Sequence, residues 1–157
     1  MNKRIATVIL ASLTIIIVVA ALVPFLPVRD QKYSELGILG PNQTASDYPT
    51  NVPANQSFLL YGFVENHQGN VQDYELQVKL GNQSTRVTNS TYATAPILAT
   101  YWHILRENET WTFPMNLSVN RAGNETRIIF ELWSYNVPTS DFEYTGLWDQ
   151  IWLNVTI

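Results

Sequence analysis

The stretch DYELQVKL, residues 73–80, alternates apolar and polar side chains without a break. Successive side chains of a β-strand point to opposite faces, so this alternation predicts a strand with one buried and one exposed face. The buried face would carry Tyr74, Leu76, Val78 and Leu80. The exposed face would carry Asp73, Glu75, Gln77 and Lys79.

Further segments on both sides of this stretch carry strand signatures, either alternation or short apolar runs. They are residues 33–39, 57–64, 96–105, 111–119, 127–135 and 147–157. Turn-forming sequences rich in Asn and Gly separate them, as at residues 66–70 and 120–124. This spacing predicts an all-β fold, an immunoglobulin-like antiparallel β-sandwich of about seven strands, with a small barrel as the alternative.

The N-terminus has the composition of a membrane anchor. Residues 5–23 contain no charged side chain, and as a helix they would extend about 29 Å, close to the thickness of the hydrocarbon core. Lys3 and Arg4 precede the run, and positive residues stay on the cytoplasmic side. We therefore expect an extracellular domain behind one uncleaved helix in the cell membrane. A cleaved secretory signal is the alternative, and it puts the domain on the same side.

These signals divide the chain into four parts. Residues 1–4 would be a cytoplasmic tip, and residues 5–26 the transmembrane helix, whose end is marked by Pro24 and Pro27. Residues 27–56, rich in Pro, Asn, Gln, Ser and Thr, would form a stalk with one short strand at 33–39. Residues 57–157 would form the β-sandwich, which the strand at 33–39 would join.

Eight Asn-X-Ser/Thr triplets follow the apolar run, and none has Pro in the middle. Their asparagines are Asn42, Asn55, Asn82, Asn89, Asn108, Asn116, Asn124 and Asn154. The triplet is the acceptor for N-linked sugar, which is attached outside the cytoplasm to a solvent-facing Asn. Asn116 fits this requirement, because it lies on the face of residues 111–119 opposite their apolar side chains. We expect a glycoprotein.

Composition excludes several function classes. The chain has no cysteine, so a disulfide, a thiolate metal site and a cysteine nucleophile are impossible. The net charge is −4, and no basic cluster follows Lys3 and Arg4, which argues against a nucleic-acid partner. The expected partners are the membrane, through residues 5–26, and other envelope proteins or a second copy of the chain.

Few residues suggest catalytic or metal chemistry. His67 and His103 are the only histidines; we interpret His67 as part of a solvated turn and His103 as a packing residue. Asp141, Glu143 and Asp149 are compatible with a glycosidase-type carboxylate pair or with Ca²⁺ ligation, but a solvated polar loop is the simpler interpretation. We expect no catalytic residue, no metal site and no cofactor.

The last strand raises the question of a contact site. In residues 147–157, Trp148 and Trp152 share a face with Asn154. A sugar on Asn154 would place both tryptophans on an exposed face, as at a partner contact. In the alternative interpretation, residues 33–39 or 141–144 fold over them. The five tryptophans and eight tyrosines are more often core residues than sugar-stacking ones.

Three segments carry a family resemblance. Residues 33–52 (YSELGILGPNQTASDYPTNV), 62–80 and 105–119 resemble the archaeal membrane-protein family known as domain of unknown function 1616. The most specific pieces are ILGP at 38–41 followed by Tyr48-Pro49, and Asn66-His67. The resemblance covers residues 33–157 and implies an extracytoplasmic β-domain, without a mechanism.

Two function classes follow from this sequence. The favoured one is a membrane-anchored, N-glycosylated surface domain with a structural or protein-interaction role and no catalysis. The alternative is a glycan-binding or glycan-processing module of the cell envelope that uses the Trp and Tyr residues and the loop around residues 141–149.

Overall fold

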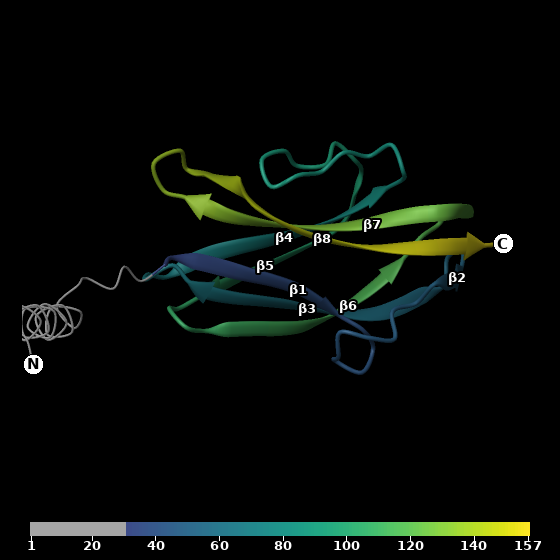
Figure 1. Cartoon of the computed structure of the whole chain (residues 1–157), viewed down its shortest axis with the longest axis horizontal. Coiled ribbons are helices and arrows are strands. Elements are labelled where there is room, and N and C mark those ends of the chain that lie inside the picture. The colour runs from purple at the N-terminus through teal and green to yellow at the C-terminus, as the bar shows by residue number, and fades with distance from the viewer. Residues whose placement is uncertain (1–30) are drawn as a thin grey trace, which may run out of the picture. The chain divides into compact units, whose positions relative to one another are not determined.

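Two β-sheets of eight strands in total make up the described part of the chain, residues 31–157, in this computed structural model (Figure 1). The fold is therefore all-β, as the strand signatures predict. The expected transmembrane helix at 5–26 lies outside the described residues. Within residues 31–157, there is no helix with the length and apolar character needed to cross a membrane.

The smaller sheet has three strands and is antiparallel throughout. In spatial order these are β1 (Tyr33–Leu39), β3 (Ser57–His67) and β6 (Thr110–Ser118). In the central strand, β3, residues 58–64 (FLLYGFV) are all apolar or aromatic. Residues 61–67 of β3 pair with β1 and residues 57–65 with β6, so that Gly62 faces Ile38 on one side and Phe113 on the other.

The larger sheet has five strands. In spatial order they are β2 (Asn51–Pro53), β8 (Asp141–Thr156), β7 (Gly123–Asn136), β4 (Gln72–Gly81) and β5 (Ile97–Leu105). All neighbours are antiparallel except β2, which pairs parallel with the end of β8. β2 lies within residues 27–56, the segment expected to be a stalk with one short strand. Residues 51–53 of that segment form a second strand, which belongs to the larger sheet.

The core lies between the two sheets and is built from the apolar face of each strand. Leu76 of β4 is fully buried, and it packs in one cluster with Leu60 of β3, Met115 of β6 and Phe130 of β7. The buried members of this cluster come from every strand of both sheets except β5, whose Leu98, Ala99 and Tyr101 pack against it. Each buried aliphatic or aromatic side chain contributes about 1.5–3 kcal/mol, so this shared core is what holds the layers together.

The structure differs from the sequence expectation in two places. Residues 141–149 are not a polar loop: they are the first half of β8, which pairs with β7 around a turn at residues 137–140. Gly146 has a left-handed backbone, φ +85°, near the register shift in this pair, and the resulting bulge interrupts the alternation that would have revealed a strand. Lys79 is buried rather than exposed.

Asn66, at the end of β3, is a fully buried amide with every polar atom in use. Its Nδ2 donates to the carbonyl oxygens of Leu105 at 3.0 Å, Arg106 at 3.1 Å and Asn70 at 2.8 Å. Its Oδ1 accepts from the Gln68 N–H and from the Tyr74 hydroxyl. Asn66 therefore ties the β3–β4 turn to the β5–β6 turn, across the two sheets.

Gly62 is required by the close approach of β3 to Phe113. A Cβ on Gly62 would lie 2.5 Å from Cζ of Phe113. Phe113 has little room to move, because it is buried and its ring stacks on Trp111 and packs against Tyr101.

We expect Gly62→Ala to lower the free energy of unfolding by about 1–3 kcal/mol, since overpacking forces side chains out of their preferred rotamers. Urea denaturation measures it. Gly37→Ala is the matched control, because a Cβ there meets Phe63 at an ordinary 3.6 Å. Equal losses in the two variants would contradict the argument.

Candidate interaction face

A row of large side chains crosses the outer face of the five-stranded sheet. The register places Trp102 of β5 beside Glu75 of β4, and Glu75 beside Trp133 of β7. Trp133 in turn lies beside Tyr144 of β8. Side chains alternate along a strand, and Leu76, next to Glu75, points into the core. The row therefore faces away from the core.

Residues 82–96, which connect β4 to β5, fold back over part of this outer face (Figure 1). We call them the covering segment. Val87 and Ala93 of the segment form a small buried cluster with Ile129 of β7, and Trp148 packs against it. The middle of β7 is consequently buried on both faces, which is why residues 127–132 are all buried.

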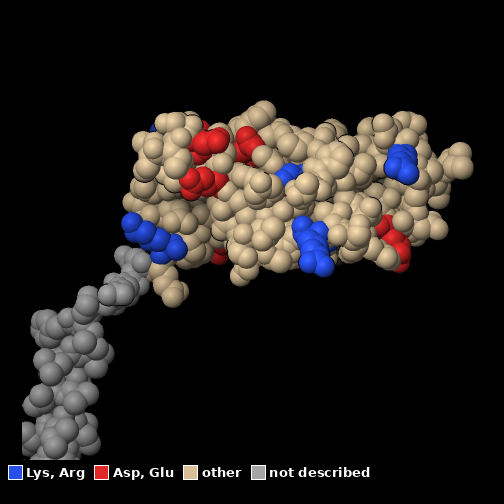
Figure 2. All heavy atoms as spheres, turned by 90° about the horizontal axis from the view of Figure 1, so that it is seen from above, with Lys and Arg blue, Asp and Glu red and all other residues tan. Residues whose placement is uncertain are grey.

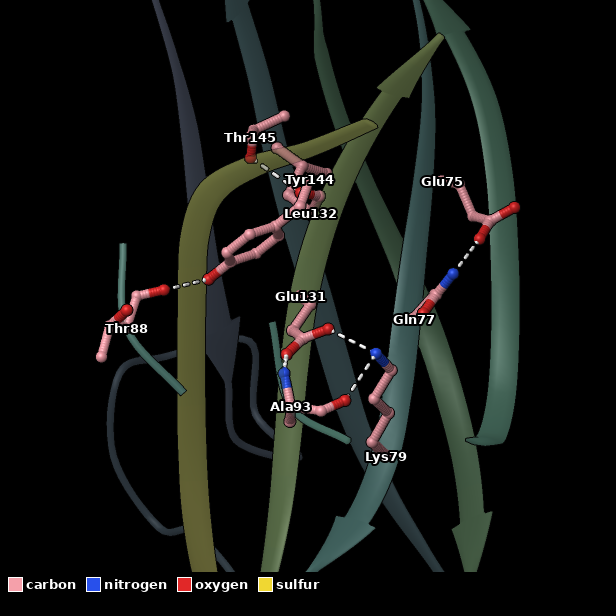
Figure 3. Close-up of polar contacts among 9 residues, drawn as sticks. All are labelled: Glu75, Gln77, Lys79, Thr88, Ala93, Glu131, Leu132, Tyr144 and Thr145. Carbon is pink, nitrogen blue, oxygen red and sulfur yellow. Dashed lines mark hydrogen bonds and ion pairs between the residues drawn. The ribbon is translucent and has the colours of Figure 1, made fainter. Parts of the chain in front are cut away.

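A buried ion pair holds the covering segment in place (Figure 3). Lys79 Nζ lies 2.7 Å from Oε2 of Glu131, and the two side chains are 5% and 0% exposed. Lys79 Nζ also donates to the Ala93 carbonyl at 3.1 Å, while the Ala93 N–H donates to Oε1 of Glu131. Buried charges are costly unless paired and hydrogen-bonded, and the backbone of Ala93 supplies both missing contacts.

Aromatic rings surround this ion pair. The Lys79 ammonium lies 5.2 Å from the ring centre of Tyr92 and 5.3 Å from that of Trp133, a cation–π arrangement. The Tyr144 hydroxyl donates to the Thr88 carbonyl at 2.8 Å and so fixes a second point of the covering segment. Burial, and then the Glu131 carboxylate, raise the pKa of Tyr144 to about 12.

Arg127 of β7 fixes the other end of the covering segment. Its Nη1 donates to the Thr85 carbonyl at 2.6 Å, and its Nε donates to Gln150 of β8. The guanidinium lies 5.6 Å from the ring centre of Trp148 and 5.4 Å from that of Trp152. Burial lowers the pKa of Arg127.

The part of the face that the covering segment leaves open lies over β5. Trp102 and Ile104 are each 60% exposed there. The Trp102 ring is held in place, because its Nε1 donates to Glu75 Oε2 at 2.6 Å, and Gln77 donates to the other oxygen of that carboxylate. We call Glu75, Trp102 and Ile104 the Trp102 patch. A fixed, exposed aromatic ring is a favourable contact residue, because little side-chain freedom is lost on binding.

Charge is sparse on the side of the molecule seen in Figure 2, where most of the visible surface belongs to residues other than Lys, Arg, Asp and Glu.

Beside the Trp102 patch, Asp73 shares its strand with Glu75. Burial, and then the Glu75 carboxylate, raise the pKa of Asp73.

The structure places all eight sequon asparagines at exposed positions. Asn82 and Asn89 belong to the covering segment, and Asn116 lies on the outer face of β6. The Asn82 carboxamide is already folded back on its own triplet, since its Oδ1 accepts from the N–H and hydroxyl of Ser84. Every triplet thus presents an asparagine to solvent.

Trp148 and Trp152, the pair singled out in the last strand, share the outer face of β8 but differ in exposure. Trp148 is half-buried and packs on the covering segment's cluster, whereas Trp152 is 40% exposed. The cover over Trp148 comes from residues 82–96 rather than from residues 33–39 or 141–144. Trp152, Tyr48 and Asp149 are among the residues that line an open pocket of about 240 Å³.

The histidines and the acidic residues around β8 are placed apart. His67 is the last residue of β3, not part of a solvated turn, and its ring stacks on Tyr33. His103 is exposed, but its ring stacks on Trp111. Among the described residues, Asp141, Glu143 and Asp149 do not come together at metal-ligand spacing, whereas Glu35, Glu65 and His67 do.

An open groove of about 760 Å³ separates the covering segment from the β6–β7 turn. Its lining includes two arginines, Arg86 and Arg121, and two sequon asparagines, Asn82 and Asn124. Sugars on these asparagines would overhang the groove, so the Trp102 patch is the better candidate for direct contact.

Sequence reasoning missed the Trp102 patch and the buried ion pair. The strand at 96–105 has apolar residues on both faces, which is the signal that β5 carries exposed apolar surface. Lys79 and Glu131 have no sequence signal of their own, because each becomes buried only when the covering segment closes over the sheet.

A family model described as "Domain of unknown function (DUF1616)" matches residues 27–151. No curated protein matches this chain. Among solved structures, a β-glucosidase from Listeria innocua in complex with glucose is similar over 80% of this chain, with 12% identity and a TM-score of 0.45. A β-D-glucoside glucohydrolase from Trichoderma reesei covers the same share, with 11% identity and a TM-score of 0.37. This chain spans 16% and 19% of those two chains.

We expect Lys79→Met and Glu131→Gln each to lower the free energy of unfolding by about 3–5 kcal/mol, because either change leaves one buried charge unpaired. Urea denaturation measures the loss. Trypsin cleavage after Arg86, in the covering segment, should also become faster in both variants. Glu143→Gln, at an exposed carboxylate, is the control and should change stability by less than about 0.5 kcal/mol.

The raised pKa of Tyr144 predicts a stability change at alkaline pH. Folding favours the neutral phenol, so its contribution is complete below the ordinary pKa of 10.0 and is lost as the pH rises to about 12. The free energy of unfolding should therefore fall over this range, and less steeply in Tyr144→Phe than in the wild type. Parallel curves for the two proteins in urea would contradict this assignment.

Proposed function

This chain belongs to the family called domain of unknown function 1616, and we propose that it is a membrane-anchored, N-glycosylated domain that contacts another envelope protein or a second copy of itself. The proposed role is binding rather than catalysis. Residues 5–26 serve as the anchor, with the N-terminus cytoplasmic and the domain outside. The archaeal cell envelope is the setting that the family resemblance implies.

The fold suits such a role. We assign the two sheets to an immunoglobulin-like β-sandwich, on the basis of their shared core and their mostly antiparallel ladders. Domains of this architecture are common at cell surfaces.

Glycosylation is supported by the exposure of all eight sequon asparagines. N-linked sugar needs an accessible carboxamide, and all eight asparagines meet this requirement. The buried Asn66 shows the contrast, since it is the one fully buried asparagine in the described range and it is not part of a triplet.

The Trp102 patch is the observation that carries the binding proposal. Trp102 and Ile104 are each 60% exposed and lie on the same face of β5. β5 is also an edge strand, so one side of its backbone has no partner strand within residues 31–157. Exposed large apolar side chains beside an unpaired edge mark a contact surface for another protein.

A glycan partner is the second candidate, and one contact favours it. The Trp102 ring is fixed by Glu75, so an exposed aromatic face lies directly beside a carboxylate. A sugar ring stacks on such a face while its hydroxyls donate to the carboxylate. Trp152, 40% exposed on β8, is the other candidate contact residue.

The first test is capture of a partner from detergent-solubilised native membrane by the full-length chain. We expect Trp102→Ser with Ile104→Ser to weaken capture about 30-fold or more, since central apolar contact residues contribute about 2 kcal/mol or more. Trp152→Ser, on the same outer face toward the opposite edge of the sheet, tests the alternative contact residue and should retain capture. The stability of both variants is measured in parallel.

Other outcomes separate the alternatives. If only Trp152→Ser abolished capture of the partner, the contact site would instead lie on β8. Binding of free oligosaccharide that requires Trp102 and Glu75 would support the glycan candidate. Protection of the domain from protease added to intact cells, with no sugar on any sequon by mass spectrometry, would overturn the extracytoplasmic placement.

A further inference from the structure

Two carboxylates lie directly opposite each other on the outer face of the three-stranded sheet. The β1–β3 register pairs Glu35 with Glu65, and His67 follows two residues later on the same face of β3. The potential ligand atoms of the three side chains all lie within 4.8 Å of one another. Glu65 and His67 are partly shielded, with side-chain exposures of 25% and 21%.

The imidazole of His67 is held in a single orientation by two neighbours that are not part of the cluster. Its ring stacks on Tyr33, with centroids 4.6 Å apart and planes inclined by 27°. Its Nδ1 lies 2.8 Å from Oδ1 of Asn108. An amide oxygen only accepts, so Nδ1 carries the proton in this contact. When the ring is neutral, Nε2 then directs its lone pair toward Glu65.

That arrangement brings electron-rich atoms together. Nε2 lies 3.1 Å from Oε1 of Glu65, a contact between two acceptors when the ring is neutral. The carboxylate of Glu35 is opposite, and like charges directly across a strand pair are destabilising. Within the part of the chain that the structure describes, neither glutamate forms an ion pair with Lys or Arg. A divalent cation would satisfy all three groups at once.

We propose that Glu35, Glu65 and His67 bind one Zn²⁺ ion on the outer face of the three-stranded sheet. One imidazole nitrogen and two carboxylate oxygens are ligands that zinc accepts, with the remaining position open to water or to an oxygen of a partner. Asn108 then has the role of the outer group that orients a metal-bound histidine by accepting its second N–H. A sugar on Nδ2 of Asn108 leaves this oxygen available.

The site would join β1 to β3. β1 is an edge strand that pairs only with β3 in the described chain, and a cation shared between Glu35 and the two β3 ligands adds a cross-link to that one ladder. The inference is independent of the binding role of the Trp102 patch, which lies on the other sheet. Either can fail without the other.

Zinc titration of the EDTA-treated full-length chain in detergent tests the proposal, by calorimetry at pH 7. We expect one saturable site per chain and a rise in the thermal unfolding midpoint. Glu35→Gln and His67→Gln should each weaken binding at least tenfold. His103→Gln and Glu107→Gln are the matched controls, at the other histidine and at an exposed glutamate, and should bind like the wild type.

A second measurement follows zinc binding by NMR in the wild-type protein and uses a variant only to assign the histidine signals. The chain has two histidines, so their ring C–H resonances are readily distinguished with His103→Gln. Zinc should shift the His67 signals and leave those of His103 in place. Absence of binding, equal binding by all four variants, or a His67 signal that responds to pH but not to zinc would each overturn the proposal.

Discussion

The hydrogen bonds of one buried amide, Asn66, constrain the end of the domain at which both proposed sites lie. Two carbonyl groups at the end of β5, those of Leu105 and Arg106, receive its N–H groups, and the Asn66 backbone bonds to Asn108 and Glu109. The β5–β6 turn therefore cannot move independently of β3. That turn carries Asn108, which orients His67, and it ends the strand that presents Trp102. A buried amide with all its bonds made is costly to disturb, because removing any partner leaves a desolvated polar group.

The buried ion pair of Lys79 and Glu131 likewise restricts the movement of a connecting segment. It holds the covering segment on the outer face of the larger sheet. Its net contribution to stability is expected to be small, since desolvation offsets much of the attraction. Its structural effect is greater, because both charged side chains also form hydrogen bonds with the backbone of Ala93. Apolar residues alone would hold residues 82–96 less specifically, since Val87 and Ala93 offer little area. The pair thus determines which half of the outer face is covered and which half remains available for contact.

Local patterns in the sequence predict the strands and the orientation of most side chains, but not what lies on top of a sheet. Alternation in residues 73–80 correctly places Tyr74, Leu76 and Val78 in the core. It misplaces Lys79, because period two distinguishes the faces of a strand without revealing whether a distant segment covers one of them. The bulge near Gly146 hides the first half of β8 for a related reason: between the pairs Glu131–Trp148 and Trp133–Tyr144, β8 has two more residues than β7, and these interrupt the regular pattern. The cluster of Glu35, Glu65 and His67 depends on the register of β1 against β3, which no local pattern specifies. The family resemblance is confirmed by the match over residues 27–151.

The direction in which the first and last strands of the domain run has a mechanical consequence. β1 starts at one end of the domain and β8 finishes at the other (Figure 1). Tension applied between Tyr33 and Thr156 would pull each of these strands along its own axis, past its antiparallel neighbour. The hydrogen bonds of the β1–β3 and β7–β8 ladders would then be loaded in shear, all at once, rather than opened one at a time from an end. A domain held at both termini would therefore resist extension far better than one in which the same strand pairs were opened one hydrogen bond at a time from one end.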